Sequence, residues 1–110
     1  MLVGNKVRDV DVKDGTCVDG EVTINNFSGR ITEDLTAAAG GQQTITLTNS
    51  QIGSTDIFLL TRQGGTNSDG TISWTVNCGS GLATITIYNK HASAQFTGTI
   101  VIGFMVIKAA

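Results

Sequence analysis

The stretch that decides the fold is residues 98–108 (GTIVIGFMVIK), the longest apolar run of the 110-residue sequence. In a β-strand, alternate side chains point to opposite faces. One face would then carry Ile100, Ile102, Phe104 and Val106, and the other Val101, Met105 and Ile107, with Gly103 as a gap. A strand with one face in water needs only one apolar face. The second face predicts burial against another sheet, an arm of the chain or another copy.

The composition around this strand is that of an all-β protein. Hydrophobic residues make up 40% of the chain and charged residues 15%, with 14 glycines and no proline. The frequent Thr, Ile and Val favour pleated, half-buried strands. A chain of this length forms one domain. The charged fraction is below the usual quarter, and the uncharged polar surface suits packing into an assembly.

Other segments read as strands of the same domain. Residues 43–49 (QTITLTN) alternate cleanly, and residues 71–78 and 82–89 predict a hairpin joined by Gly79, Ser80 and Gly81. The continuous run at residues 57–60 (IFLL) predicts a fully buried strand. Seven or eight antiparallel strands at this spacing predict a single-domain β-sandwich or jelly roll. The predicted core is Ile24, Ile31, Ile45, Leu47, Ile57, Leu59, Trp74, Val76, Ile85, Ile87, Ile100, Ile102 and Phe104.

The chain divides into an N-terminal arm, residues 1–16, and a sandwich domain, residues 17–110. In the arm, Val7, Val10 and Val12 are separated by charged residues, which predicts a weak strand or an extended segment. Chain ends of this kind are loose unless something ties them down. We expect the arm to pair with a sheet edge, either its own or that of a neighbour.

Composition argues against nucleic-acid and membrane partners. The net charge is −2, and the basic residues are scattered, whereas nucleic-acid binding needs a clustered positive surface. The apolar run near the C-terminus is too short to span a bilayer. The first residues lack a charged segment followed by an apolar core, so no signal peptide is expected. Cys17 and Cys78 permit one disulfide without requiring it, and Cys78 is in phase with inward-facing positions.

The sequence contains no recognisable catalytic motif, so no enzyme, metal or cofactor is predicted. His91 is the only histidine and no serine lies in a nucleophile elbow, which favours a histidine that hydrogen-bonds within its loop. The acidic residues between Asp9 and Glu21 do not match a calcium loop and are better explained by turns. The glycines of residues 63–70 lack the helix and Lys-Ser/Thr pair of a phosphate loop.

Three aromatic residues, Phe58, Trp74 and Tyr88, could form a platform for a sugar. Trp74 is in phase with Ile72 and Val76, which favours the core, and Phe58 lies within the apolar run. Tyr88 is in phase with two threonines and is expected on an outer face. Tyr88 is therefore the best single candidate for an interface contact.

Two stretches resemble a known group of proteins. Residues 37–52 (AAAGGQQTITLTNSQI) and 85–109 (ITIYNKHASAQFTGTIVIGFMVIKA) are similar to small virion proteins of tailed bacteriophages. In those proteins an ITLTNS strand and an N-x-H-A segment followed by G-x-(I/V)-x-(I/L)-G-F-x-V recur. The matching positions here include Asn89, His91, Gly98, Gly103 and Phe104. The N-terminal arm is not part of the pattern.

The resemblance implies a non-enzymatic β-sandwich of the virion, assembled in the host cytoplasm. The leading expectation is a capsid decoration (cement) protein that self-associates as a homotrimer and binds the major capsid protein. The alternative is a tail-fibre or receptor-binding domain whose loops at residues 63–70 and 89–97 contact a host glycan. The predicted interface residues are Val101, Gly103, Met105, Ile107, Tyr88, Val7, Val10 and Val12.

Overall fold

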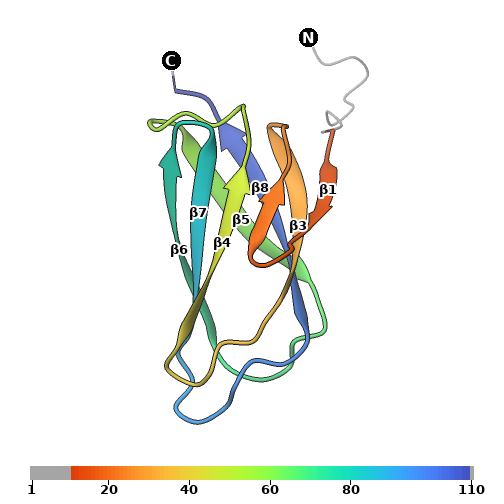
Figure 1. Cartoon of the computed structure of the whole chain (residues 1–110), viewed down its shortest axis with the longest axis vertical. Helices are drawn as coiled ribbons and strands as arrows, with labels where there is room; N and C mark the ends of the chain where they lie inside the picture. Colours follow the sequence, from red (N-terminus) through yellow and green to blue (C-terminus); the bar gives the residue numbers. More distant parts are fainter. Residues whose placement is uncertain (1–10, 110) are drawn as a thin grey trace, which may run out of the picture.

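The protein is a sandwich of two four-stranded β-sheets, seen in a computed structural model that describes residues 11–109 (Figure 1). The all-β sandwich predicted from the sequence is confirmed. The strands are β1 (Lys13–Thr16), β2 (Glu21–Thr23), β3 (Ser28–Asp34), β4 (Gln42–Thr48), β5 (Ile57–Gly64), β6 (Ile72–Gly79), β7 (Leu82–Asn89) and β8 (Thr99–Ile107). The part of the chain that the structure describes contains no helix able to cross a membrane.

The strand order is β1-β3-β8-β5 in one sheet and β2-β4-β7-β6 in the other. The long strands pair antiparallel, as expected. The two short strands do not, because β1 runs parallel to β3 and β2 runs parallel to β4. The prediction of antiparallel strands throughout is therefore wrong for these two pairs. Residues 13–16, assigned above to the arm, are an edge strand of the first sheet.

The core lies between the central strands of the two sheets. Strands β4, β7 and β8 alternate as the sequence predicts, and their inward side chains are fully buried, including Ile45, Ile85 and Ile102. Burial of such aliphatic side chains stabilises by about 1.5–3 kcal/mol each. Loop residues that no periodicity identifies complete the core, namely Leu35, Ile52 and Phe96.

Strand β5 is an edge strand, and the prediction that it is fully buried is wrong. Ile57 and Leu59, placed in the predicted core, lie on the exposed outer face, while Phe58 and Leu60 face inward. Phe58 stacks on Phe104 with the ring centroids 5.4 Å apart. A run of four apolar residues supplies both faces equally well, so alternation could not fix which pair points inward.

Strand β6 is the edge strand of the second sheet and forms the predicted hairpin with β7. Gly79 pairs with Leu82 across a two-residue turn, in which Gly81 has a φ of 77°. That left-handed conformation suits glycine. Trp74 and Val76 point toward the core but are only half-buried, because no strand of the described chain lies beyond β6. Cys17 and Cys78 are both free.

Candidate interaction surface

Four exposed aliphatic side chains form a continuous apolar patch on the outer face of the β1-β3-β8-β5 sheet. They are Ile57 and Leu59 of β5 with Met105 and Ile107 of β8, which are 56%, 49%, 39% and 42% exposed. The strand register places Ile57 opposite Ile107 and Leu59 opposite Met105. Such directly paired side chains have Cβ atoms about 5 Å apart, so the four share one surface. We call these four residues the apolar patch.

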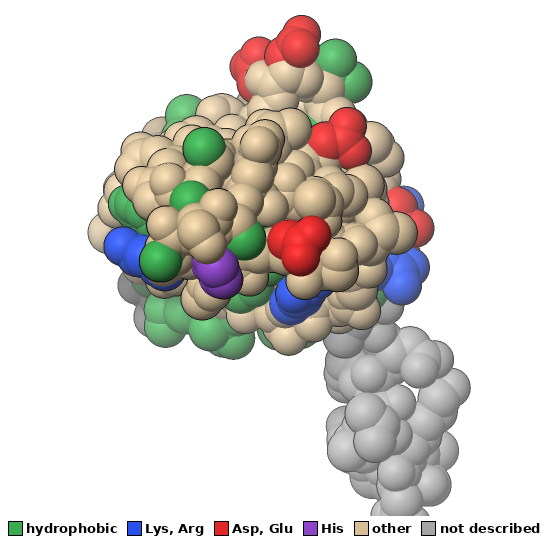
Figure 2. All heavy atoms as spheres, turned by 90° about the horizontal axis from the view of Figure 1, so that it is seen from below, with side chains coloured by type: hydrophobic (Ala, Val, Ile, Leu, Met, Phe, Trp, Pro, Cys, Tyr) green, Lys and Arg blue, Asp and Glu red, His purple; other side chains and the backbone are tan. Residues whose placement is uncertain are grey.

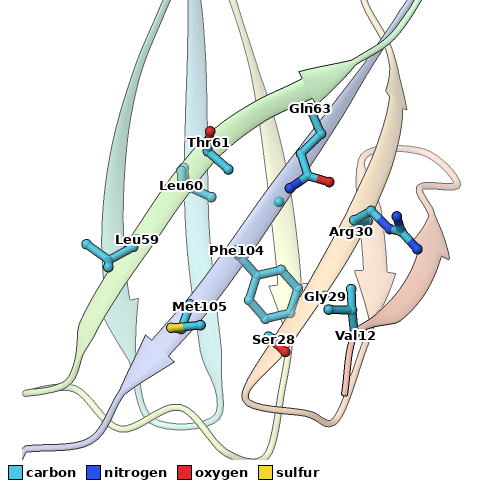
Figure 3. Close-up of a pocket in the computed structure, with 11 residues that line it drawn as sticks. Val12, Ser28, Gly29, Arg30, Leu59, Leu60, Thr61, Gln63, Phe104 and Met105 are labelled. Atoms are coloured by element: carbon cyan, nitrogen blue, oxygen red, sulfur yellow. The ribbon is translucent and has the colours of Figure 1, made fainter. Parts of the chain in front are cut away.

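A hollow of about 630 Å³ adjoins the apolar patch (Figure 3). Leu59 and Met105 line one end, and Arg30 with Gln63 lines the other, while the Phe104 ring lies between them. The Arg30 Nε donates to Asp14 Oδ1 at 2.8 Å, so this cation is already paired within the sheet. Apart from the end formed by Arg30 and Gln63, the lining of the hollow is chiefly apolar.

The structure places the other predicted interface residues of β8 in two different settings. The space above Gly103 is filled by Gln63, because a Cβ atom on Gly103 would lie 2.6 Å from the Gln63 Nε2. Gly103 therefore admits a side chain of its own domain. Val101 faces the same outer side and is half-buried opposite Thr32.

The predicted interface residues of the arm are only partly described. Val12 is exposed and lines the hollow, on the side of Gly29 and away from Leu59 and Met105. The carbonyl of Asp11, just before it, accepts hydrogen bonds from Asn26 Nδ2 at 2.6 Å and Ser28 Oγ at 2.9 Å. Val7 and Val10 lie outside the described residues.

Tyr88 lies on the opposite outer face, as its phase with the threonines predicts. Tyr88 belongs to β7 and is paired with Gln42 of β4 on one side and Ser73 of β6 on the other. The Lys90 Nζ lies 4.8 Å from the centroid of its ring. We call this outer side of the β2-β4-β7-β6 sheet the hydroxyl face, because paired threonines dominate it. They are Thr44, Thr46, Thr75, Thr84 and Thr86.

An ion pair holds the end of the apolar patch in place. Asp56, just before Ile57, pairs with Lys108, just after Ile107. The Asp56 side chain is only 4% exposed, and it also accepts the backbone N–H groups of Gly53 at 2.7 Å and Ala109 at 2.9 Å. The hydrogen bond from Lys108, followed by those backbone donors, lowers the Asp56 pKa to about 2. The start of β5 and the end of β8 are thus joined through charged and backbone groups.

Glu33 is a buried acid at the inner side of β3, with only 8% of it exposed. Desolvation raises its pKa, although the Asp34 N–H donates to its Oε1 at 3.0 Å and partly opposes the shift. Burial and, next, the negative charge of Glu33 raise the pKa of Cys17 to about 12. Cys17 is therefore held as the protonated thiol, and its side chain packs against the core.

The N-x-H-A segment noted in the sequence builds a turn. Asn89 is fully buried, and its Oδ1 accepts the N–H groups of Thr71 and His91, each at 3.1 Å. Its Nδ2 donates to the carbonyls of Ala37 and Ala94 at 3.2 and 2.7 Å. The sequence signal for this role was the Asn at the end of an alternating strand, but its partners are distant in the chain.

His91 has the local role that the sequence predicted. Its Nδ1 accepts the N–H groups of Ser93 and Ala94 at 3.0 and 2.8 Å. The imidazole thereby closes the loop after β7, and its hydrogen bonds are those of a loop-capping residue.

The end of the sandwich that holds the loops 35–41, 65–71 and 90–98 is largely uncharged (Figures 1 and 2). Figure 2 views this end and shows mostly uncharged polar surface, a few scattered charges of both signs, and hydrophobic side chains along the lower margin. Loops 65–71 and 90–98 are bonded together, since the Thr97 N–H donates to Asn67 Oδ1 at 2.9 Å. A shallow hollow of about 460 Å³ nearby is lined by Arg62, Asn67, Ser68, Gly70, Thr71, Ile72 and Trp74.

Comparison with known proteins gives no relative. No family model, curated protein or solved structure matches the chain. Among residues 11–109, no group of three or more His, Cys, Asp or Glu side chains is placed to hold a metal ion. The chemistry of the surface is thus the main guide to function.

Proposed function

We propose that the protein is a non-enzymatic assembly module that docks through the apolar patch. The observation that carries this proposal is the pairing of Ile57 with Ile107 and Leu59 with Met105 on a sheet face that no described residue covers. Contiguous exposed apolar side chains of this kind mark interaction surfaces. Their contact with a partner would be favourable by about 25 cal/mol per Å² of apolar surface buried.

The setting that we propose is a phage virion, in which the protein decorates the head as a self-associating cement protein, with three copies as the expected unit. The support is the resemblance of residues 37–52 and 85–109 to small virion proteins. A patch of four side chains is small beside the roughly 800 Å² per partner of a typical stable interface. Repetition over a shell would turn such weak contacts into firm attachment through avidity.

The experiment is light scattering during size exclusion, combined with co-sedimentation on expanded heads of the phage that encodes the protein. The proposal predicts self-association in solution and saturable binding to heads. A chain that stays monomeric at every concentration and never sediments with heads would overturn it.

A second function, glycan binding by a tail appendage, is favoured by one observation. The 460 Å³ hollow brings the half-buried Trp74 beside the polar side chains of Arg62, Asn67 and Ser68. An aromatic surface with a few placed polar groups is typical of small-ligand sites. Binding on a glycan array that is lost in Asn67→Ala and Trp74→Phe would support this function, and no binding to any cell-surface sugar would count against it.

A further inference from the structure

The hollow of about 460 Å³ lies between the edge strands of the two sheets. Arg62 lines it from β5, and Ile72 and Trp74 line it from β6. Each of the three is paired across its sheet with a fully buried residue, namely Ile102, Asn89 and Ile87. Directly paired side chains lie on the same face of a sheet. The hollow is therefore the place where the space between the sheets opens to solvent beside an exposed cation and a half-buried indole.

Arg62 is a cation with no acidic partner in the part of the chain that the structure describes. None of the ion pairs among residues 11–109 includes it, whereas Arg30 and Lys108 each pair with an aspartate. Its Nη2 donates to the Asn67 carbonyl at 3.2 Å and its Nε to the Gly64 carbonyl at 3.5 Å. A guanidinium has five N–H donors in a planar fork, so most of its donors remain available to a ligand.

The loop at residues 65–71, which forms the polar rim of the hollow, is held in place before any ligand binds. The Asn67 N–H donates to the Thr99 carbonyl at 2.9 Å, and Asn67 Oδ1 accepts the Thr97 N–H at 2.9 Å. Gly70 has a φ of 82° and packs closely on Phe96, because a Cβ atom on Gly70 would lie 2.6 Å from the Phe96 Cδ1. A rim that is already ordered loses little conformational entropy on binding.

We propose that this hollow binds a pyranose sugar that carries a carboxylate, the chemistry shared by uronic acids and sialic acids. The inference rests on the second function proposed above, glycan binding, and names its substrate class. Arg62 would hold the carboxylate through two parallel N–H···O bonds, the geometry that suits a guanidinium. The accessible part of the Trp74 ring would contact the sugar ring. Asn67 and Ser68 would hydrogen-bond the hydroxyl groups.

The charge of the hollow favours a carboxylate over a phosphate or a nucleic acid. Among the described residues that line the hollow, Arg62 is the only basic one. Asp69, next to Ser68, adds a negative charge to the same loop. A phosphate monoester carries close to two negative charges at neutral pH, and nucleic-acid binding needs several clustered cations. A ligand with one negative charge matches the single arginine.

The experiment uses Trp74 as its reporter, since it is the only tryptophan of the chain. Full-length protein is titrated with sodium glucuronate, N-acetylneuraminate, glucose and acetate at constant ionic strength, and amide NMR shifts of residues 67–70 give a second readout. At least one acidic sugar should bind about tenfold or more tightly than glucose and acetate, because only an acidic sugar satisfies both Arg62 and Trp74. The acidic sugar that binds more tightly identifies the source of the ligand.

Three variants test the role of the guanidinium. Arg62→Met removes the charge and should lower the affinity for the acidic sugar about tenfold, to that for glucose. Arg62→Lys should recover only part of the affinity, because an ammonium group cannot make the two parallel bonds. Lys90→Met is the matched control, since it removes one cation beside Tyr88 on the hydroxyl face and should leave the affinity unchanged.

Equal binding of glucose and the acidic sugars would overturn the inference while leaving glycan binding in place. Acetate that binds as tightly as the acidic sugars would also overturn it, and so would affinity that survives Arg62→Met. If none of the four compounds changes the fluorescence or the amide shifts, the inference fails, whereas the second function fails only when the glycan array is also silent. None of these results depends on self-association through the apolar patch.

Discussion

The two outer faces of the sandwich are built from the same alternating pattern but for different surroundings. On the hydroxyl face, Thr44 pairs with Thr86 and Thr46 with Thr84, so these central outward positions carry small polar groups. On the other face, the equivalent positions of β5 and β8 carry the apolar patch. Both inner faces are apolar, as a sandwich requires. Formation of the core therefore does not require the outer face of β5 and β8 to be apolar.

The largest expected effect comes from placing one charge on each face in turn. Met105→Glu should leave the domain folded but weaken self-association and head binding by roughly 100-fold or more, because an unpaired charge would be buried at the contact. Thr86→Glu, the matched change on the hydroxyl face, should leave both almost unchanged. Light scattering and co-sedimentation give the two affinities. Equal losses in the two variants, or no loss in either, would contradict the contrast between the faces.

A change at the buried loop anchor should affect folding and spare the apolar patch. Asn89→Ala removes four hydrogen bonds and leaves the N–H groups of Thr71 and His91 and the carbonyl of Ala94 without these partners, so the free energy of unfolding should fall by about 2–4 kcal/mol. Asn77→Ala, at an exposed outward position of β6, should change it by less than about 0.5 kcal/mol. Urea unfolding provides the comparison. An Asn89→Ala protein as stable as the wild type would show that its four hydrogen bonds contribute little.

Acid should test the ion pair that fixes the end of the apolar patch. The Asp56 pKa is lowered from 3.8 to about 2, so its contribution to stability is present above pH 3.8 and is lost as the pH falls through about 2. Asp56→Asn should therefore melt at a lower temperature than the wild type at neutral pH, and the gap should close near pH 2. Asp19→Asn, which removes one exposed carboxyl that takes no part in this ion pair, is the control.

The smallest effect is expected at Glu33. Its pKa is raised, so the folded state favours the protonated acid, and stability falls as the pH rises above the ordinary value of 4.5. Glu33→Gln should remove this loss and raise the melting temperature at pH 7 by about 2–4 °C. The exposed Glu21→Gln is the control. A melting temperature that does not rise in Glu33→Gln would contradict the role of desolvation.

The sequence predicted most of the fold wherever one face of a strand was polar. For residues 43–49, the alternation of apolar and polar side chains predicts one orientation of the strand. For the β6–β7 hairpin, the same alternation and the glycine-containing turn predict one pairing. The run at residues 57–60 has two readings, and which pair points inward depends on a neighbouring strand that the sequence does not show. The parallel pairing of β1 with β3 and of β2 with β4 likewise cannot be predicted from such short segments.

The candidate surface was predicted in part for the same reason. Met105 and Ile107 were found because β8 is apolar on both faces, whereas Ile57 and Leu59 were assigned to the core. The filling of the Gly103 gap by Gln63 depends on a contact between strands far apart in sequence. Tyr88 was placed on an outer face correctly, but on the face opposite the apolar patch.

The most direct test is hydroxyl-radical labelling of the free and head-bound protein, with one reporter on each face. Met105 reports on the apolar patch and Tyr88 on the hydroxyl face, and both are partly exposed in the described fold. Our account predicts that labelling of Met105 falls several-fold on binding while labelling of Tyr88 stays constant. Unchanged labelling of Met105, or protection of Tyr88 in its place, would contradict the account.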